Sequence, residues 1–130
     1  MDTAVSKERI ESYLMKLSLT FQEGEDGSWI VRDPEKGLDN LLIVAVESLV
    51  VMRLNVMLVP KGRRAELFEE LLRLNATDMV HGAYALDGDK IIIIDTLEAA
   101  TMDLEEFQAS IDAIGLAVAQ HYKKLSAYRG

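Results

Sequence analysis

The chain has 130 residues and a mass of 14.5 kDa, which predicts one domain over residues 1–130 and leaves little room for a second. Hydrophobic residues make up 49% of it and charged residues 28%, the balance of a globular protein rather than of a disordered, fibrous or membrane protein. Fourteen Lys and Arg residues against twenty-two Asp and Glu residues give a net charge of −8, so nucleic acids and anionic membranes would repel this acidic protein. The absence of cysteine excludes disulfides, thiol nucleophiles and cysteine-ligated metals.

Neither the start of the chain nor its apolar runs indicate export or membrane insertion. Residues 1–10 mix polar and charged side chains, without the basic and then apolar order of a secretory signal. The longest apolar runs, residues 41–46 and 56–59, have the length of strands and fall far short of the roughly 20 residues that cross a bilayer. We therefore expect a cytoplasmic protein with no membrane and no nucleic-acid partner.

The first half of the chain predicts a helix followed by an antiparallel meander. Apolar residues recur at three-and-four spacing over residues 3–17, which is typical of an amphipathic helix. Turn-rich segments and β-branched runs then alternate as far as Pro60, which ends the last strand because proline cannot donate to a ladder. The expected strands are residues 19–22, 28–33, 41–46 and 49–59.

The second half predicts a helix, a hairpin and a final helix. Leucines between charged residues indicate a helix over residues 65–74, which Asn75 would end in a left-handed cap. The turn Asp87-Gly88-Asp89 between apolar runs predicts a hairpin. Asp103, with Glu106 three residues later, predicts the cap of a helix that runs to about Lys123. This order, helix, strands, helix, two strands, helix, predicts an α+β fold with an antiparallel sheet.

The long strand over residues 49–59 carries apolar side chains on both of its faces. One alternating set contains Val50, Met52, Leu54 and Val56; the other contains Leu49, Val51, Arg53, Asn55, Met57 and Val59. A sheet with two apolar faces needs cover on both of them. Either the chain's own helices cover both faces, or one face is used for dimerisation or for capture of a partner.

We single out Val50, Met52, Leu54 and Val56 as the candidate protein-binding or dimer interface, although the same residues would equally serve as core. No phosphate-binding glycine loop and no nucleophile elbow is present, so no catalytic, cofactor-binding or metal-ligating residue is predicted. His81 and His121 lie on different predicted elements and lack the spacing of a metal site. We expect His81 at a strand end and His121 facing solvent near a helix terminus.

Three segments in the second half of the chain carry a family resemblance: residues 71–76 (LLRLNA), 82–87 (GAYALD) and 91–97 (IIIIDTL). Together with the final helix they resemble the central signature of class I type III secretion chaperones, which are Tir chaperone-like, and of YbjN-like proteins. The resemblance implies an α+β fold in a protein of a usually dimeric family, and it does not imply an active site. For secretion chaperones it implies that apolar patches hold an unfolded segment of an effector. The longer strand region that includes residues 33–40 makes this chain more similar to the YbjN-like proteins.

The leading hypothesis is therefore a cytoplasmic, non-catalytic, homodimeric protein-binding module, chaperone-like, with a client or regulatory protein as partner. An alternative is a small-molecule-sensing regulator with a pocket between the sheet and the last helix. Ala113, Gly115, Ala117 and Ala119 would leave space for such a pocket, although small residues also permit close helix packing. An enzyme without a recognisable motif is the third possibility.

Overall fold

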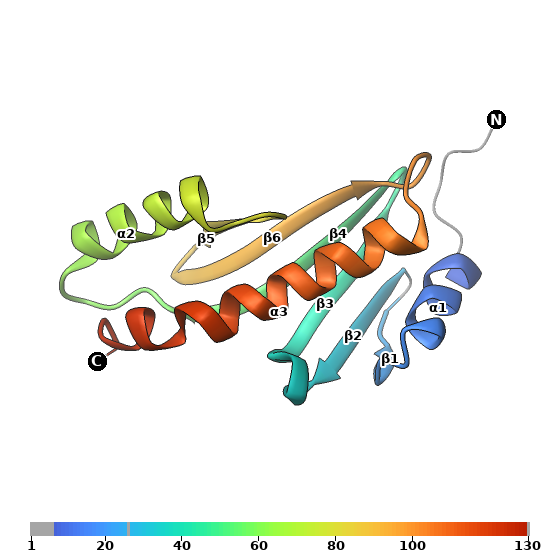
Figure 1. Ribbon diagram of the computed structural model, residues 1–130, viewed down its shortest axis with the longest axis horizontal. Coiled ribbons are helices and arrows are strands. Elements are labelled where there is room, and N and C mark those ends of the chain that lie inside the picture. Colours follow the sequence, from blue (N-terminus) through green and yellow to red (C-terminus); the bar gives the residue numbers. More distant parts are fainter. Residues whose placement is uncertain (1–6, 26, 130) are drawn as a thin grey trace.

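One antiparallel sheet of six strands organises the structure, a computed structural model that describes residues 7–25 and 27–129 (Figure 1). The strands follow the order β1-β2-β3-β4-β6-β5 across the sheet, and three helices accompany them, which confirms the expected α+β fold. The elements in chain order are α1 (Lys7–Lys16), β1 (Phe21–Glu23), β2 (Ser28–Asp33), the short 3-10 helix η1 (Pro34–Lys36), β3 (Leu38–Val46), β4 (Leu49–Leu58), α2 (Arg64–Thr77), β5 (Ala83–Asp87), β6 (Lys90–Glu98) and α3 (Leu104–Ser126).

Most differences from the predicted elements lie at their ends. The helix expected from residue 3 is described from Lys7 onward, since residues 3–6 lie outside the described part of the chain. The helix α2 continues to Thr77, so the prediction that Asn75 ends it is wrong. Asn75 stays helical because its side-chain amide binds the backbone of Tyr84 instead of capping the helix. The predicted cap of α3 is confirmed, with the Glu106 N–H donating to the Asp103 carboxylate at 2.8 Å.

The two faces of the sheet have different cover. Helix α3 runs across one face, with α1 beside its start and α2 beside its end (Figure 1). Side chains that point toward the helices, such as Ile43, Met52 and Ile93, are fully buried. Their neighbours on the opposite face, such as Val44 and Val51, stay partly exposed. No helix covers that opposite face in the part of the chain that is described, and no helix there is long and apolar enough to cross a membrane.

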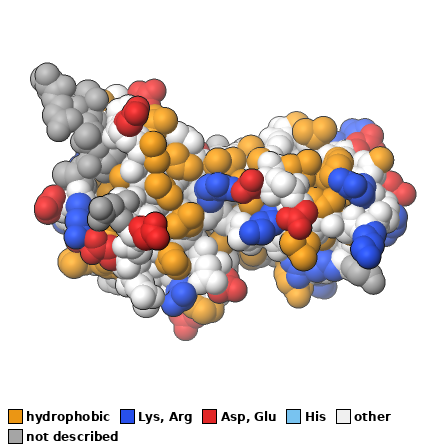
Figure 2. Space-filling model, turned by 180° about the vertical axis from the view of Figure 1, so that it is seen from behind, with side chains coloured by type: hydrophobic (Ala, Val, Ile, Leu, Met, Phe, Trp, Pro, Cys, Tyr) orange, Lys and Arg blue, Asp and Glu red, His pale blue; other side chains and the backbone are white. Residues whose placement is uncertain are grey.

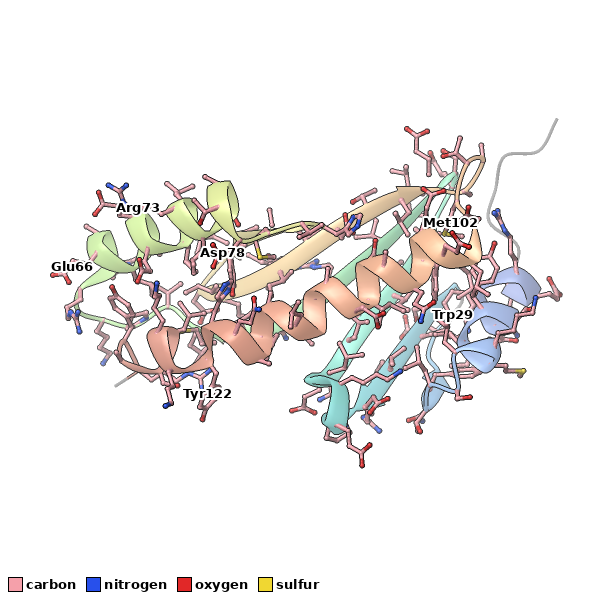
Figure 3. All side chains as sticks on the ribbon, viewed as in Figure 1. Trp29, Glu66, Arg73, Asp78, Met102 and Tyr122 are labelled. Carbon is pink, nitrogen blue, oxygen red and sulfur yellow. The ribbon has the colours of Figure 1, made fainter. Side chains whose placement is uncertain are left out.

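Close contacts fix the helices to the covered face. Gly115 of α3 lies against the carbonyl oxygen of Lys36, which would be 2.2 Å from any β-carbon at position 115, so only glycine fits. Arg9 of α1 donates to the backbone carbonyls of Ala99 and Met102 in the loop before α3. The indole N–H of Trp29, which is buried, donates to Glu11 of α1 at 3.0 Å (Figure 3). The sheet, α1 and α3 therefore share one hydrophobic core.

Candidate functional site

The predicted interface residues lie mainly under the helices. Val50 and Met52 are fully buried and Leu54 is nearly so, because their side chains point toward α3. Val56 lies at a bulge where the register between β4 and β6 shifts, and it is only half-buried. An interface role for these four residues stays a prediction, and three of them would need α3 to move aside.

The opposite side of the sheet, which we call the open face, carries many apolar side chains. Its members come from strands that pair side by side: Ile30 opposite Leu42, Val44 opposite Val51, and Ile94 opposite Arg53. At its margins Val46, Leu49 and Leu58 are exposed, and Leu58 shows 63% of its surface. Arg53 forms an ion pair with Asp87 of the edge strand. Hydrophobic side chains are spread over this side of the molecule (Figure 2). The strand register also places Lys90 and Glu98 on this side, so the open face combines apolar area with charged side chains on β4, β5 and β6.

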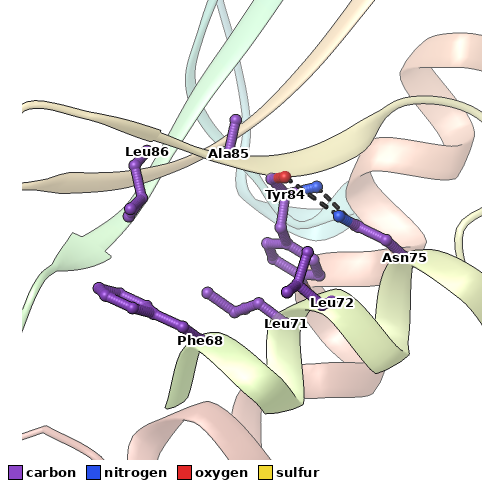
Figure 4. Close-up of a pocket in the computed structure, with 7 residues that line it drawn as sticks. All are labelled: Phe68, Leu71, Leu72, Asn75, Tyr84, Ala85 and Leu86. Atoms are coloured by element: carbon purple, nitrogen blue, oxygen red, sulfur yellow. Dashed lines mark hydrogen bonds between the residues drawn. The ribbon is translucent and has the colours of Figure 1, made fainter. Parts of the chain in front are cut away.

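A second apolar feature lies at the edge of the sheet, between α2 and β5 (Figure 4). This α2–β5 groove has a volume of about 290 Å³ and is lined by Phe68, Leu71, Leu72, Asn75, Tyr84, Ala85 and Leu86. Leu72 is 68% exposed and Leu86 is 51% exposed. Neither leucine is among the interface residues predicted from the sequence. The sequence does indicate that Leu72 is exposed. It lies outside the helical stripe formed by Leu67, Leu71 and Leu74, which faces the core.

Asn75 closes part of the exposed edge of β5. Its amide group accepts from the Tyr84 backbone N–H at 2.7 Å and donates to the Tyr84 carbonyl at 3.2 Å, as a neighbouring strand would. In an antiparallel ladder alternate residues face the outer edge, so the backbone N–H and C=O of Leu86 also point outward. The groove thus lies beside an edge strand that is only partly closed.

Three polar side chains join α2, β5 and α3 behind the groove. The Tyr84 hydroxyl lies 2.7 Å from His121 Nδ1, and His121 Nε2 lies 3.1 Å from the carboxylate of Asp78. Asp78 follows α2 and is labelled in Figure 3. His121 is only 4% exposed, so the prediction that it faces solvent is wrong. Both of its ring nitrogens are occupied by partners that are distant in sequence, which makes the buried position acceptable.

Two of these side chains, Tyr84 and Asp78, have shifted pKa values with clear physical causes. Burial raises the pKa of Tyr84 well above its usual range, and the nearby Asp78 carboxylate adds to the rise. The hydrogen bond from Thr77, followed by the one from His121, lowers the pKa of Asp78. Tyr84 therefore stays neutral at physiological pH, while Asp78 is ionised. With its nitrogens engaged on both sides, His121 connects three elements rather than facing a substrate cavity.

The pocket predicted between the sheet and the last helix does not lie beside Gly115 and Ala117. Gly115 makes a close contact with Lys36, and Ala117 is buried, so these small residues serve helix packing. A cavity of about 270 Å³ does lie farther along α3, between Leu54 and Val56 of the sheet and Val118 and Tyr122 of the helix. It is smaller than the roughly 300–1,000 Å³ of usual small-molecule sites. A role in small-molecule sensing stays a prediction.

No cluster of three or more His, Asp or Glu side chains is arranged to hold a metal ion among residues 7–25 and 27–129. His81 lies in the loop just before β5, near the strand end where it was expected. The features that stand out in the described chain are therefore two apolar surfaces, the open face and the α2–β5 groove.

Comparison with known proteins agrees with this architecture. The model of the type III secretion chaperone family, CesT_Tir_1, matches residues 3–129. The chain belongs to this family. No curated protein sequence matches it significantly.

Solved structures share the fold at low sequence identity. YbjN from E. coli has a TM-score of 0.67 and 14% identity, over 91% of this chain and 92% of that one. The type III secretion chaperone SycH from Yersinia pestis, in complex with a fragment of YscM2, has a TM-score of 0.63 and 14% identity, over 87% of this chain and 96% of that one. A chain of the ExoU–SpcU heterodimer from Pseudomonas aeruginosa has a TM-score of 0.61 and 13% identity, over 85% of this chain and 93% of that one. These chains share the fold although their sequences differ greatly.

Proposed function

We propose that the chain, as a single domain, is a cytoplasmic, non-catalytic protein-binding module that works as a homodimer and holds a segment of a partner polypeptide. The observation that carries the proposal is the sheet with helices on one face and apolar side chains on the other. Apolar surface left open on a folded domain is typical of an interaction site. Family membership supports this function, as do the structures of SycH with a YscM2 fragment and of the ExoU–SpcU heterodimer.

The second copy of the chain is proposed to contact the α2–β5 groove. Leu72 and Leu86 flank a groove that is otherwise lined almost entirely by apolar side chains, beside β5, the edge strand of the sheet formed by the described residues. A two-fold symmetric contact would let each copy place the same leucines against the other. Burial of these side chains removes apolar area from water on both copies at once.

The partner polypeptide is proposed to lie on the open face. Its side chains would contact the apolar rows formed by Leu42, Val44 and Val51, and the ion pair of Arg53 with Asp87 offers a polar contact among them. A flat apolar face accepts varied sequences because hydrophobic contact is non-directional. This arrangement leaves the helix-covered core intact during binding.

The experiment uses reduced, carboxymethylated α-lactalbumin as an unfolded polypeptide probe, with binding followed by fluorescence anisotropy. The test variant combines Val44→Lys with Val51→Glu, a cross-strand pair on the open face, so the net charge stays constant and the new charges face each other. The control combines Met15→Lys with Leu116→Glu, two exposed apolar residues on helices. We expect the open-face variant to bind at least about tenfold more weakly than wild type and the control to bind normally. Equal binding by a folded open-face variant would overturn the proposal.

A further inference from the structure

The fold gathers positive charge at one end of an acidic molecule. Residues 59–90 and 118–129, which meet at the end formed by α2, the β5–β6 turn and the end of α3, carry eight cationic and six acidic residues. The rest of the chain carries six cationic and sixteen acidic residues. Lys and Arg side chains are concentrated at the right-hand end of Figure 2, which is this end of the molecule. The structure therefore separates charges that are mixed along the sequence.

A cleft at this end is lined by cationic side chains and by no acidic one. It has a volume of about 560 Å³, and its lining includes Pro60, Lys61, Arg63, Tyr128 and Arg129. We call it the basic cleft. Three cations around one concave surface attract carboxylates, and the surrounding protein strengthens this attraction relative to open water.

The two guanidinium groups in the basic cleft are held in place. Arg63 stacks on the Tyr128 ring at 4.6 Å, and Arg129 lies 5.5 Å from the centre of the Tyr122 ring and donates to the Val56 carbonyl at 3.1 Å. Groups positioned in advance lose less entropy when a ligand binds. Arg63 also pairs with Glu66 at 3.1 Å, so an incoming carboxylate has to share or replace that partner.

The basic cleft continues the open face. Leu58, at the end of β4, pairs with Lys90 on the open face and is largely exposed. A shallow concave strip formed by residues 56–60 and Arg129 connects this point with the cleft. A chain that lies on the open face and leaves it over Leu58 therefore arrives among Lys61, Arg63 and Arg129.

We propose that the basic cleft binds an acidic stretch of the partner polypeptide, adjacent to the apolar stretch on the open face. The inference rests on the proposed function for the identity of the ligand as a polypeptide. Short runs of Asp and Glu fit the cleft because guanidinium groups pair with carboxylates in two-pronged geometry. A long polyanion such as a nucleic acid is disfavoured, since it would extend over the acidic remainder of the chain.

The test measures binding of a dye-labelled peptide of ten glutamates at low and at physiological salt, by fluorescence anisotropy. The cleft variant combines Lys61→Glu with Arg129→Glu. The control combines Lys16→Glu with Lys36→Glu, which changes the net charge equally at exposed sites outside the cleft. We expect at least a tenfold loss of affinity in the cleft variant and less than a threefold loss in the control. Glu66→Gln should tighten binding, because it removes the competing carboxylate beside Arg63.

Two results would overturn the inference: equal losses in the cleft variant and the control, or single-stranded DNA of ten thymidines binding as tightly as the peptide with the same response to the variants. The second result would indicate a site for polyanions in general. The glutamate peptide has no apolar side chains, so its binding does not depend on the open face. Failure of the cleft is therefore distinguishable from failure of the proposed function, which the α-lactalbumin experiment reports separately.

Discussion

The two faces of strand β4 differ in their cover rather than in their composition. Val50 and Met52 point under α3 and are buried, whereas Val51 and Arg53, their immediate neighbours, point to the open face. Apolar residues occur in both sets, so hydrophobicity alone identifies a strand that needs cover without saying what covers each side. The helices cover one side. We infer that a partner polypeptide covers the other, and the following experiments test that division.

The largest expected difference in stability is between two variants that each place one aspartate on β4, one on the covered face and one on the open face. Met52→Asp should lower the free energy of unfolding by at least about 4 kcal/mol, because it removes core packing and buries a carboxylate without a partner. Val51→Asp, at the adjacent position, should cost only about 1 kcal/mol, since its side chain reaches solvent. Urea denaturation followed by fluorescence of Trp29, the single tryptophan and a buried one, measures both.

Equal destabilisation by the two variants would contradict the division of the sheet into a covered and an open face. It would mean that side chains on the open face are as inaccessible as the core. A circular dichroism spectrum of each variant keeps a folded but weakened protein distinct from an unfolded one.

A smaller effect is expected where α3 docks on the covered face. Gly115→Ala should lower stability by about 1–3 kcal/mol, because the new methyl group would meet the Lys36 carbonyl and force the helix or the turn to shift. Gly62→Ala is the matched control, since a methyl group there has no neighbour within 4 Å. Thermal unfolding of both variants measures the difference. A Gly115→Ala variant as stable as the wild type would mean that α3 packs less closely on the sheet than described. The covered and open faces of the sheet would then differ less than we infer.

Much of the fold was predictable because residues close together in the sequence determine its turns, helix caps and element order. The Asp87-Gly88-Asp89 turn is confirmed, with Gly88 in the left-handed region at a φ of 62°, where glycine is favoured. The cap at Asp103 and the alternation of helices and strands were equally local. These features depend on residues that are close in sequence, so a single sequence is sufficient to find them.

The surfaces were less predictable because they depend on distant residues. The interface role of Val50, Met52 and Leu54 stays a prediction, but their burial depends on the position of α3, which begins at Leu104 and is distant from them in the sequence. His121 was expected in solvent, and only the fold brings it beside Tyr84 and Asp78. Likewise, the basic cleft joins the β4–α2 connection to residues 127–129, which follow α3. Nothing local in the sequence indicates which residues meet in this way.

The most direct test of the proposed homodimeric protein-binding module is its mass in solution, measured by light scattering over a dilution series. We predict twice 14.5 kDa for the wild-type chain and for Leu116→Asp, an exposed position on α3 away from the α2–β5 groove. Leu72→Asp, at the rim of the groove, should give a folded monomer of 14.5 kDa. A wild-type chain that is monomeric at every concentration, or a Leu72→Asp variant that stays dimeric, would contradict the account.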